Sequence, residues 1–180
     1  MAAASTPAAD RRASTSALLD LGIYPVQFAS MVLGAPTRVT AVGGMTETGV
    51  DAYSTLTLEY DGVAQASLHS SILARTPVTA AVSGTEGMIT IDSLFYTPSS
   101  FTLWSGDFFG PSTTWTDPTG LRLFNGLSWE ATALARFVGE GRTESPVHTL
   151  DETVAILAVI DEARAQLAVA RPIRIEEHRT

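Results

Sequence analysis

The chain has 180 residues, of which 45% are hydrophobic and 17% are charged, and its formal net charge is -8 at pH 7. This length and composition indicate a globular protein with one hydrophobic core. The negative charge disfavours a nucleic-acid surface, which needs clustered basic residues. The absence of cysteine excludes disulfides, thiolate nucleophiles and cysteine-ligated metals. All eleven basic residues are arginine, so the chain has no lysine to offer for catalysis.

The N-terminal region predicts a tail followed by an irregular helix. Residues 1–13 are mostly Ala, Ser, Thr and Pro and predict a flexible tail or linker. They contain no apolar segment of signal-peptide length, so we expect a cytoplasmic location. The stretch 17–33 predicts a helix that is capped by Ser16 and ended by Gly34. Pro25 has no backbone N–H, and we therefore expect a kink or a local irregularity around it.

The middle of the chain is rich in β-branched residues and turn signals. The segment 37–42 predicts a strand, and 53–60 and 63–73 predict a hairpin around the Asp61–Gly62 turn. A second hairpin is expected over 77–84 and 87–92, followed by a weaker strand over 100–105. The segment 103–120 contains Gly, Pro and aromatic residues, and we expect a loop there.

Two helices are expected to close the fold. The first spans 128–138 and stops before Gly139, and the second begins with a capping box from Thr149 to Glu152. The order of a helix, several strands and two helices predicts an α+β fold, an open and largely antiparallel β-sheet with helices packed on one face. We expect residues 14–180 to form one domain. No Gly-rich phosphate-binding motif follows a strand, so a nucleotide-binding fold is not predicted.

The first helix carries a carboxylate and a phenol four residues apart, Asp20 and Tyr24. This spacing places both groups on one helix face. A tyrosine has an unperturbed pKa of about 10 and needs a nearby cation to act as an acid-base group near neutrality. Asp20 is then better suited to accept a hydrogen bond from a substrate. From the spacing alone, a catalytic pair and a merely structural pair both remain open, because Asp20 also suits a helix N-terminus and Tyr24 can pack in the core.

Other candidate groups give weaker signals. The histidines, His69, His148 and His178, lack the spacing of metal ligands, so no metal site is predicted. The segment 103–120 holds four large aromatic residues: Trp104, Phe108, Phe109 and Trp115. They could wall a sugar-sized pocket, seal an interface or simply pack within a loop.

Several segments, in the same order, resemble one known family. "ALLDLGIYPVQFA", "VSGTEGMITID" and "LSWEATALARFVGEGRTESPVHTLDETVAILAVIDEARAQL" are similar to the C-terminal domain of the glucose–fructose oxidoreductase / inositol dehydrogenase (Gfo/Idh/MocA) family. The closest resemblance is to the branch of dimeric dihydrodiol dehydrogenases and xylose dehydrogenases. It spans nearly all of residues 16–167.

The resemblance implies the C-terminal half of a two-domain oxidoreductase that acts on a sugar or trans-diol hydroxyl. NAD or NADP would be bound mainly by an N-terminal Rossmann domain that this chain lacks, so no cofactor is expected for the chain alone. Tyr24 would be the acid-base residue, Asp20 would help to place the substrate, and a lysine of the missing domain would supply the cation. The aromatic residues Trp104, Phe109 and Trp115 would contribute to substrate binding.

The resemblance also implies an oligomer, and the chain differs from the family pattern at one place. The open sheet face would form the interface of a dimer or tetramer. The expected ligand is a small-molecule substrate, and neither nucleic acid nor a membrane is expected as a partner. Family members usually have glycines just before the Ala-Leu-Leu-Asp stretch, where this chain has Ser14, Thr15 and Ser16. A stand-alone, non-enzymatic oligomerisation or sugar-binding domain therefore remains the alternative.

Overall fold

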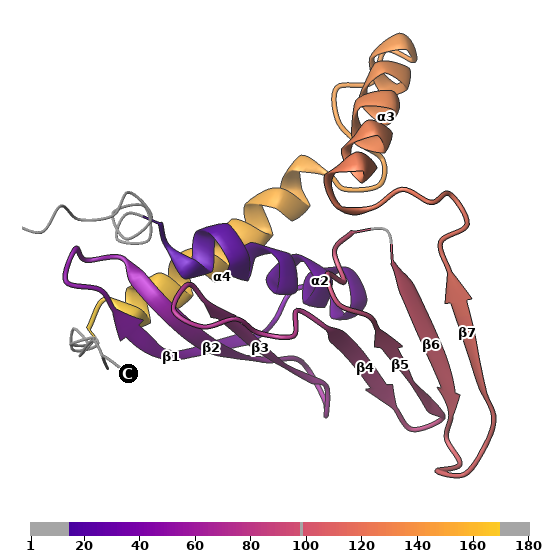
Figure 1. Cartoon of the computed structure of the whole chain (residues 1–180). Helices are drawn as coiled ribbons and strands as arrows, with labels where there is room; N and C mark the ends of the chain where they lie inside the picture. Colours follow the sequence, from indigo (N-terminus) through magenta and orange to yellow (C-terminus); the bar gives the residue numbers. More distant parts are fainter. Residues whose placement is uncertain (1–14, 98, 170–180) are drawn as a thin grey trace, which may run out of the picture. The chain divides into compact units, whose positions relative to one another are not determined.

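The computed structural model of the chain describes residues 15–97 and 99–169. They fall into two compact units, one formed by residues 15–76 with 150–169 and the other by the described residues of 77–149 (Figure 1). The predicted tail over 1–13 lies outside the described residues. Both units are built from antiparallel sheet and helix, so the predicted α+β class is confirmed.

The sheet of the first unit contains β1 (Arg38–Met45), β2 (Asp51–Glu59) and β3 (Gln65–Ser71) in that order, all antiparallel. The predicted hairpin is β2–β3, with Glu59 paired to Gln65. Its turn is longer than the two residues expected, because residues 60–64 all lie outside the ladder. Gly62 has a φ of +86° in this turn, which only glycine adopts readily.

Three helical segments of the first unit cover one face of this sheet (Figure 1). They are η1 (Leu18–Gly22), α2 (Ile23–Leu33) and α4 (Leu150–Leu167). Side chains of η1, α2 and α4 meet alternate residues of β2 in the core, and the most deeply buried large ones are Leu18, Val26, Leu56, Leu58, Ile160 and Leu167. The alternation of β2 explains this arrangement, since every second residue of a strand points to the same face.

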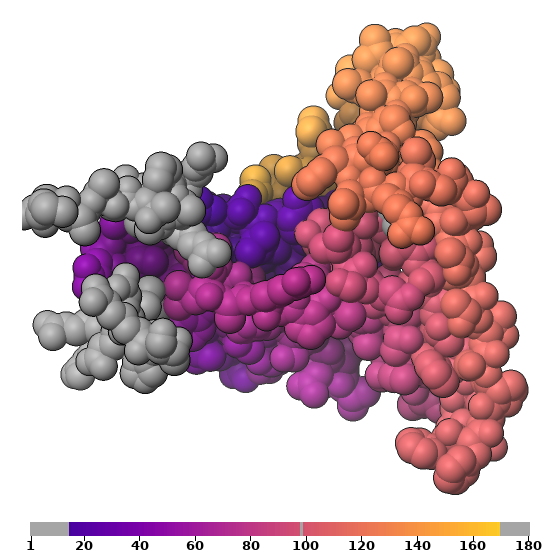
Figure 2. Space-filling view, viewed as in Figure 1, coloured from indigo at the N-terminus to yellow at the C-terminus, as the bar shows by residue number. Residues whose placement is uncertain are grey.

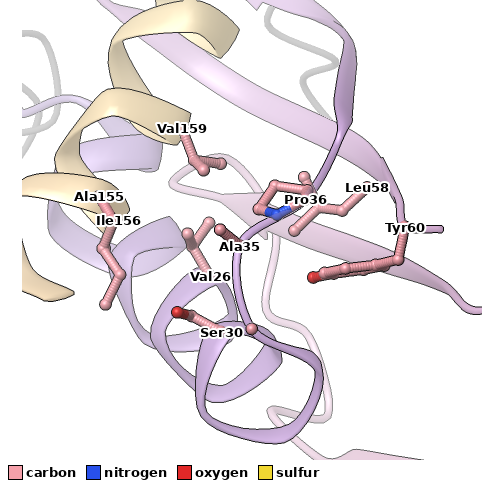
Figure 3. Close-up of a pocket in the computed structure, with 10 residues that line it drawn as sticks. Val26, Ser30, Ala35, Pro36, Leu58, Tyr60, Ala155, Ile156 and Val159 are labelled. Atoms are coloured by element: carbon pink, nitrogen blue, oxygen red, sulfur yellow. The ribbon is translucent and has the colours of Figure 1, made fainter.

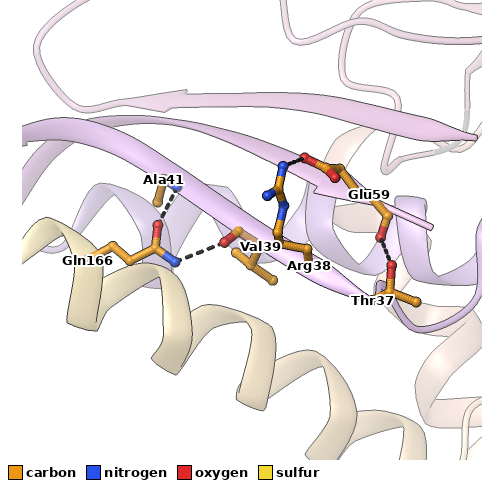
Figure 4. A network of polar contacts seen from close by, with 6 residues as sticks. All are labelled: Thr37, Arg38, Val39, Ala41, Glu59 and Gln166. Atoms are coloured by element: carbon orange, nitrogen blue, oxygen red, sulfur yellow. Dashed lines mark hydrogen bonds and ion pairs between the residues drawn. The ribbon is translucent and has the colours of Figure 1, made fainter. Parts of the chain in front are cut away.

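A glutamine on α4 forms hydrogen bonds with the backbone of β1, the edge strand of the sheet. The side-chain amide of Gln166 accepts a hydrogen bond from the Ala41 N–H (2.8 Å) and donates one to the Val39 carbonyl (2.9 Å) (Figure 4). These bonds satisfy backbone groups that an edge strand leaves unpaired. The helix is therefore fixed to the strand by directional bonds as well as by apolar packing.

The second unit has a four-stranded antiparallel sheet in the order β4 (Ala80–Gly84), β5 (Gly87–Ile91), β6 (Ser100–Ser105) and β7 (Ser112–Thr116). It also contains η2 (Leu123–Gly126) and α3 (Leu127–Gly139). The β4–β5 hairpin and β6 confirm the sequence-based predictions. The expectation of a loop over 103–120 was wrong in part, because the Thr-rich stretch forms β7 and pairs with β6.

The two faces of the second sheet differ in polarity. Strand alternation and register place most of the apolar side chains on one face and mainly threonine and serine, with Met88 and Trp104, on the other. The apolar face is formed by Ala80, Val82, Ile89, Ile91, Phe101, Leu103 and Trp115. The connection between β6 and β7 projects from the end of this sheet (Figure 2). None of the helices described is long and apolar enough to cross a membrane.

Candidate functional site

The helix that carries the predicted Asp20–Tyr24 pair is irregular where Pro25 predicts it. Asp20 lies in η1, a π-helical turn, and Tyr24 is the second residue of the α-helix that follows. Pro25 cannot donate a hydrogen bond to the carbonyl of Leu21, and the change from π- to α-helix takes place just before it. The local irregularity is confirmed, and Gly34 ends α2 with a φ of +80° as expected.

Glycine at position 22 lets η1 approach the sheet closely. A Cβ atom on Gly22 would lie 2.6 Å from Leu18 Cδ1 and 3.2 Å from Ser70 Oγ, so a side chain here would displace the turn. Ser70 is itself buried and hydrogen-bonds to the buried hydroxyl of Ser54 (3.0 Å). The turn therefore sits directly on the ends of β2 and β3.

A buried carboxylate, Asp51 at the start of β2, holds the beginning of η1. Only 4% of Asp51 is exposed. One of its oxygens accepts a hydrogen bond from Ser16 Oγ (2.5 Å) and the other from the Leu18 N–H (2.6 Å). Ser16 Oγ in turn accepts the Leu19 N–H (3.1 Å), which confirms the predicted capping role of Ser16. A negative charge at a helix N-terminus is favourable, so Asp51 both caps and anchors the turn.

Asp20 lines an open hollow of about 380 Å³, a volume that suits a small-molecule substrate. The hollow lies between η1 and the segment that follows β3, and its other lining residues are Thr15, Leu21, Ser71, Ile72, Leu73, Ala74 and Arg75. Tyr24 is 37% exposed one turn further along the helix and is not among these residues. The sequence-based analysis missed Arg75, because a single arginine after a strand has no distinctive motif.

A second, much smaller space lies among α2, α4 and the end of β2 (Figure 3). Its volume of about 10 Å³ holds one water molecule at most, so it is not a substrate site. The buried hydroxyl of Tyr60 borders it and has no hydrogen-bond partner among the described residues. Burial raises the pKa of Tyr60 above its ordinary value. The nearby Ser30 lines the same space.

The predicted aromatic residues do not form one cluster. Trp104 lies on the polar face of the second sheet, where its Nε1–H donates to Thr90 Oγ1 (2.9 Å), whereas Trp115 lies on the apolar face and stacks on Phe101 (ring centroids 5.3 Å apart). Phe109 is 93% exposed in the β6–β7 connection. These residues belong to the other unit from Asp20 and Tyr24, and their proposed substrate contacts stay predictions.

The described residues contain neither a cluster of metal-binding side chains nor a Rossmann fold. They contain no group of three or more His, Asp or Glu side chains that could hold a metal ion. Every pair of strands described is antiparallel, whereas a Rossmann fold needs parallel strands and a Gly-rich turn that leads into a helix. Of the histidines, His69 hydrogen-bonds to Thr55 Oγ1 (3.2 Å) and His178 lies outside the described residues.

Comparison with known proteins identifies related sequences. A family model described as the GFO/IDH/MocA C-terminal domain matches residues 3–90. Trans-1,2-dihydrobenzene-1,2-diol dehydrogenase of Xenopus laevis is 38% identical over 169 residues, which cover 92% of this chain and 51% of that protein. The corresponding human enzyme is 34% identical over 167 residues, covering 92% and 50%. The chain thus spans about half the length of the curated relatives it matches.

Solved structures show the same fold at low sequence identity. UDP-N-acetylglucosamine 3-dehydrogenase GnnA from Acidithiobacillus ferrooxidans superposes with a TM-score of 0.72 at 17% identity, over 91% of this chain and 50% of that one. KijD10, a 3-ketoreductase from Actinomadura kijaniata in complex with NADP and TDP-benzene, gives a TM-score of 0.71 at 20% identity, over 89% and 50%. The fold described above is therefore that of one half of these oxidoreductases.

The anchor on η1 gives a stability prediction. Replacing Asp51 by alanine leaves the Leu18 N–H and the Ser16 hydroxyl without their buried partner, and we expect the free energy of unfolding to fall by about 2–3 kcal/mol. Urea denaturation measures the change. Asp61→Ala, in the exposed β2–β3 turn, is the matched control and should change stability by less than about 0.5 kcal/mol. An equal effect of both substitutions would contradict the anchoring role.

Proposed function

Because the chain belongs to the GFO/IDH/MocA C-terminal domain family, we propose that it is the substrate-binding and oligomerisation half of an NAD(P)-dependent oxidoreductase. The reaction would oxidise a hydroxyl of a sugar or a trans-diol, or reduce the corresponding ketone. The observation that carries the proposal is the position of Asp20, which lines a substrate-sized hollow on an irregular turn held by Asp51. Tyr24 follows on the next turn with more than a third of its surface exposed.

In this proposal the two side chains have distinct tasks. The Tyr24 hydroxyl exchanges a proton with the reacting oxygen of the substrate, as a general acid in one direction and a general base in the other. The Asp20 carboxylate accepts a hydrogen bond from a substrate hydroxyl and so orients the molecule. The start of the turn is bonded to the buried Asp51, and its end at Gly22 lies close against β3, so the turn holds the two groups in a fixed relation.

In this proposal the remaining parts of the reaction belong to the half of the relatives that this chain does not match. NAD or NADP, when bound there, supplies the hydride acceptor or donor. A phenolate needs a stabilising cation, and the chain contains no lysine. We therefore propose that the chain alone has no dehydrogenase activity and acts, in the cytoplasm, together with a nucleotide-binding domain.

The role of Tyr24 is tested in a fusion. We would join this chain to the part of the Xenopus laevis relative that it does not match and measure NADP-dependent oxidation of trans-1,2-dihydrobenzene-1,2-diol. The variant Tyr24→Phe should lower kcat by about 100-fold or more, because it removes the proton that is exchanged. The matched control is Tyr96→Phe, since Tyr96 is 39% exposed against 37% for Tyr24.

Two results would speak against this assignment. A loss of only a few-fold in kcat for Tyr24→Phe would make the tyrosine a structural residue. A similar loss in the Tyr96→Phe control would show that the fusion responds to any loss of a tyrosine hydroxyl.

The sheets favour self-association as a second part of the proposal. The apolar face of the β4–β7 sheet exposes 38% of Phe101, 51% of Leu103 and 48% of Trp115. Contiguous apolar surface of this kind is typical of a protein interface. By contrast, the uncovered face of the β1–β3 sheet carries mainly polar side chains, among them Thr55, Thr57 and Ser67. We therefore propose a homo-oligomer whose contact includes the apolar face of the second sheet.

A charge on the apolar face tests this interface. Leu103→Glu should convert the oligomer to monomer in multi-angle light scattering, because a buried carboxylate without a partner is strongly unfavourable. Thr114→Glu places the same charge on the opposite face of the neighbouring strand and should leave the mass unchanged. A monomeric wild-type chain at high concentration, or an oligomer insensitive to Leu103→Glu, would contradict the proposed interface.

A further inference from the structure

The hollow beside Asp20 contains one positively charged side chain, that of Arg75. Arg75 is exposed and makes no ion pair or hydrogen bond with any described residue. Other arginines are engaged: Arg38, Arg136, Arg142 and Arg164 each pair with a carboxylate. An unpaired guanidinium in a concave, substrate-sized site is available for an anionic ligand.

The segment that presents Arg75 is well ordered by hydrogen bonds. The Ile72 N–H donates to the Ala52 carbonyl (2.9 Å), which extends the pairing of β3 with β2 by one residue. Ser71 Oγ then accepts the N–H groups of Leu73 (3.1 Å) and Ala74 (3.2 Å). This turn fixes the backbone just before Arg75, so the guanidinium has a defined starting point at the rim of the hollow.

The charges of the hollow limit which anion fits. Asp20 contributes one negative charge and Arg75 one positive charge, and the two side chains are not paired with each other within the described residues. A single carboxylate balances Arg75 and forms two parallel hydrogen bonds with its planar guanidinium. A phosphate dianion would leave one charge unbalanced and would be repelled by Asp20.

The rest of the lining suits a carbon skeleton that bears hydroxyls. Leu21, Ile72 and Leu73 supply apolar surface for C–H groups, while Thr15 and Ser71 place hydroxyls in the same hollow. Asp20 can only accept hydrogen bonds when ionised and therefore selects a donor such as a substrate hydroxyl. A ligand that bears both hydroxyls and a carboxylate would therefore satisfy Asp20 and Arg75 together.

We propose that this hollow binds a polyhydroxylated carboxylic acid of the sugar-acid class, with Arg75 pairing with the ligand carboxylate and Asp20 accepting a hydrogen bond from a ligand hydroxyl. The proposal rests on the proposed function and narrows its substrate class from any sugar or diol to one that carries a carboxylate. Arg75 is then the residue that selects the acid over its neutral analogue.

The test compares two probes that differ in one group. D-glucuronate carries a carboxylate where D-glucose has a hydroxymethyl group, and binding of each to the 180-residue chain is followed by ¹H–¹⁵N NMR titration. We expect glucuronate to bind about tenfold more tightly than glucose. Arg75→Gln should remove this preference, and Arg75→Lys should keep part of it.

Arg122→Gln is the matched control, because the guanidinium of Arg122 also pairs with no carboxylate among the described residues but lies in the other unit. It should leave the preference unchanged, and circular dichroism should show that all variants remain folded. The proposal is overturned if glucuronate and glucose bind equally, if neither binds, or if Arg75→Gln has no effect. Tighter, Arg75-dependent binding of D-glucose 6-phosphate would also overturn it, in favour of a phosphate site.

This outcome is separable from that of the proposed function. The titration needs neither turnover nor cofactor, so a preference that depends on Arg75 stands even if the fusion is inactive. Conversely, if the activity of the fusion depends on Tyr24 but the chain shows no preference for the acid, the oxidoreductase proposal stands and the sugar-acid proposal is rejected.

Discussion

The arrangement of the candidate site depends on one buried interaction, the carboxylate of Asp51 at the start of η1. Its two oxygens take hydrogen bonds from Ser16 and from the backbone of Leu18, and this joins the first turn of the helix to the end of the sheet. Gly22 allows the same turn to lie against β3 without a steric clash. Asp20 lies between these two fixed points, so its position is set by the sheet rather than by the helix alone. Ser16, which bonds to Asp51 and accepts the Leu19 N–H, therefore has a structural role.

The same anchoring explains how the first helix accommodates a π turn followed by Pro25. A π turn is rarer than an α turn and is frequently found at functional sites. Here Pro25 interrupts the α-helical ladder at its start, and the buried contacts of Leu18 and Val26 on either side hold the irregular turn in place. The result is a helix whose irregular part faces a hollow, while its regular part supports the core. A site built in this way is rigid without needing a ligand.

Much of this could be predicted from the sequence, and the failures have identifiable causes. Local signals were sufficient for the helices, for the hairpins and for the break at Pro25, because proline, glycine and β-branched runs act within a few residues. The β7 strand was missed because glycine, proline and aromatic residues precede it and masked its threonines. Asp51 was not predicted because it bonds to residues 33 or more positions away in the sequence, which no local pattern reveals. Arg75 was not predicted because the hollow that it lines is formed by two segments that are distant in the sequence. The aromatic residues of 103–120 do not gather in one loop, because Trp104 and Trp115 lie on paired strands and point to opposite faces of the sheet.

The central claim is that this chain holds the substrate side of an active site and depends on another domain for the cofactor. Transfer of deuterium from deuterated NADPH to a ketone substrate tests this most directly, when it is measured by mass spectrometry for the chain alone and for the chain fused to the unmatched part of the Xenopus laevis relative. The account predicts labelled product from the fusion and none from the chain alone. Label transfer catalysed by the chain by itself, or its absence from a folded fusion that binds NADPH, would contradict the account.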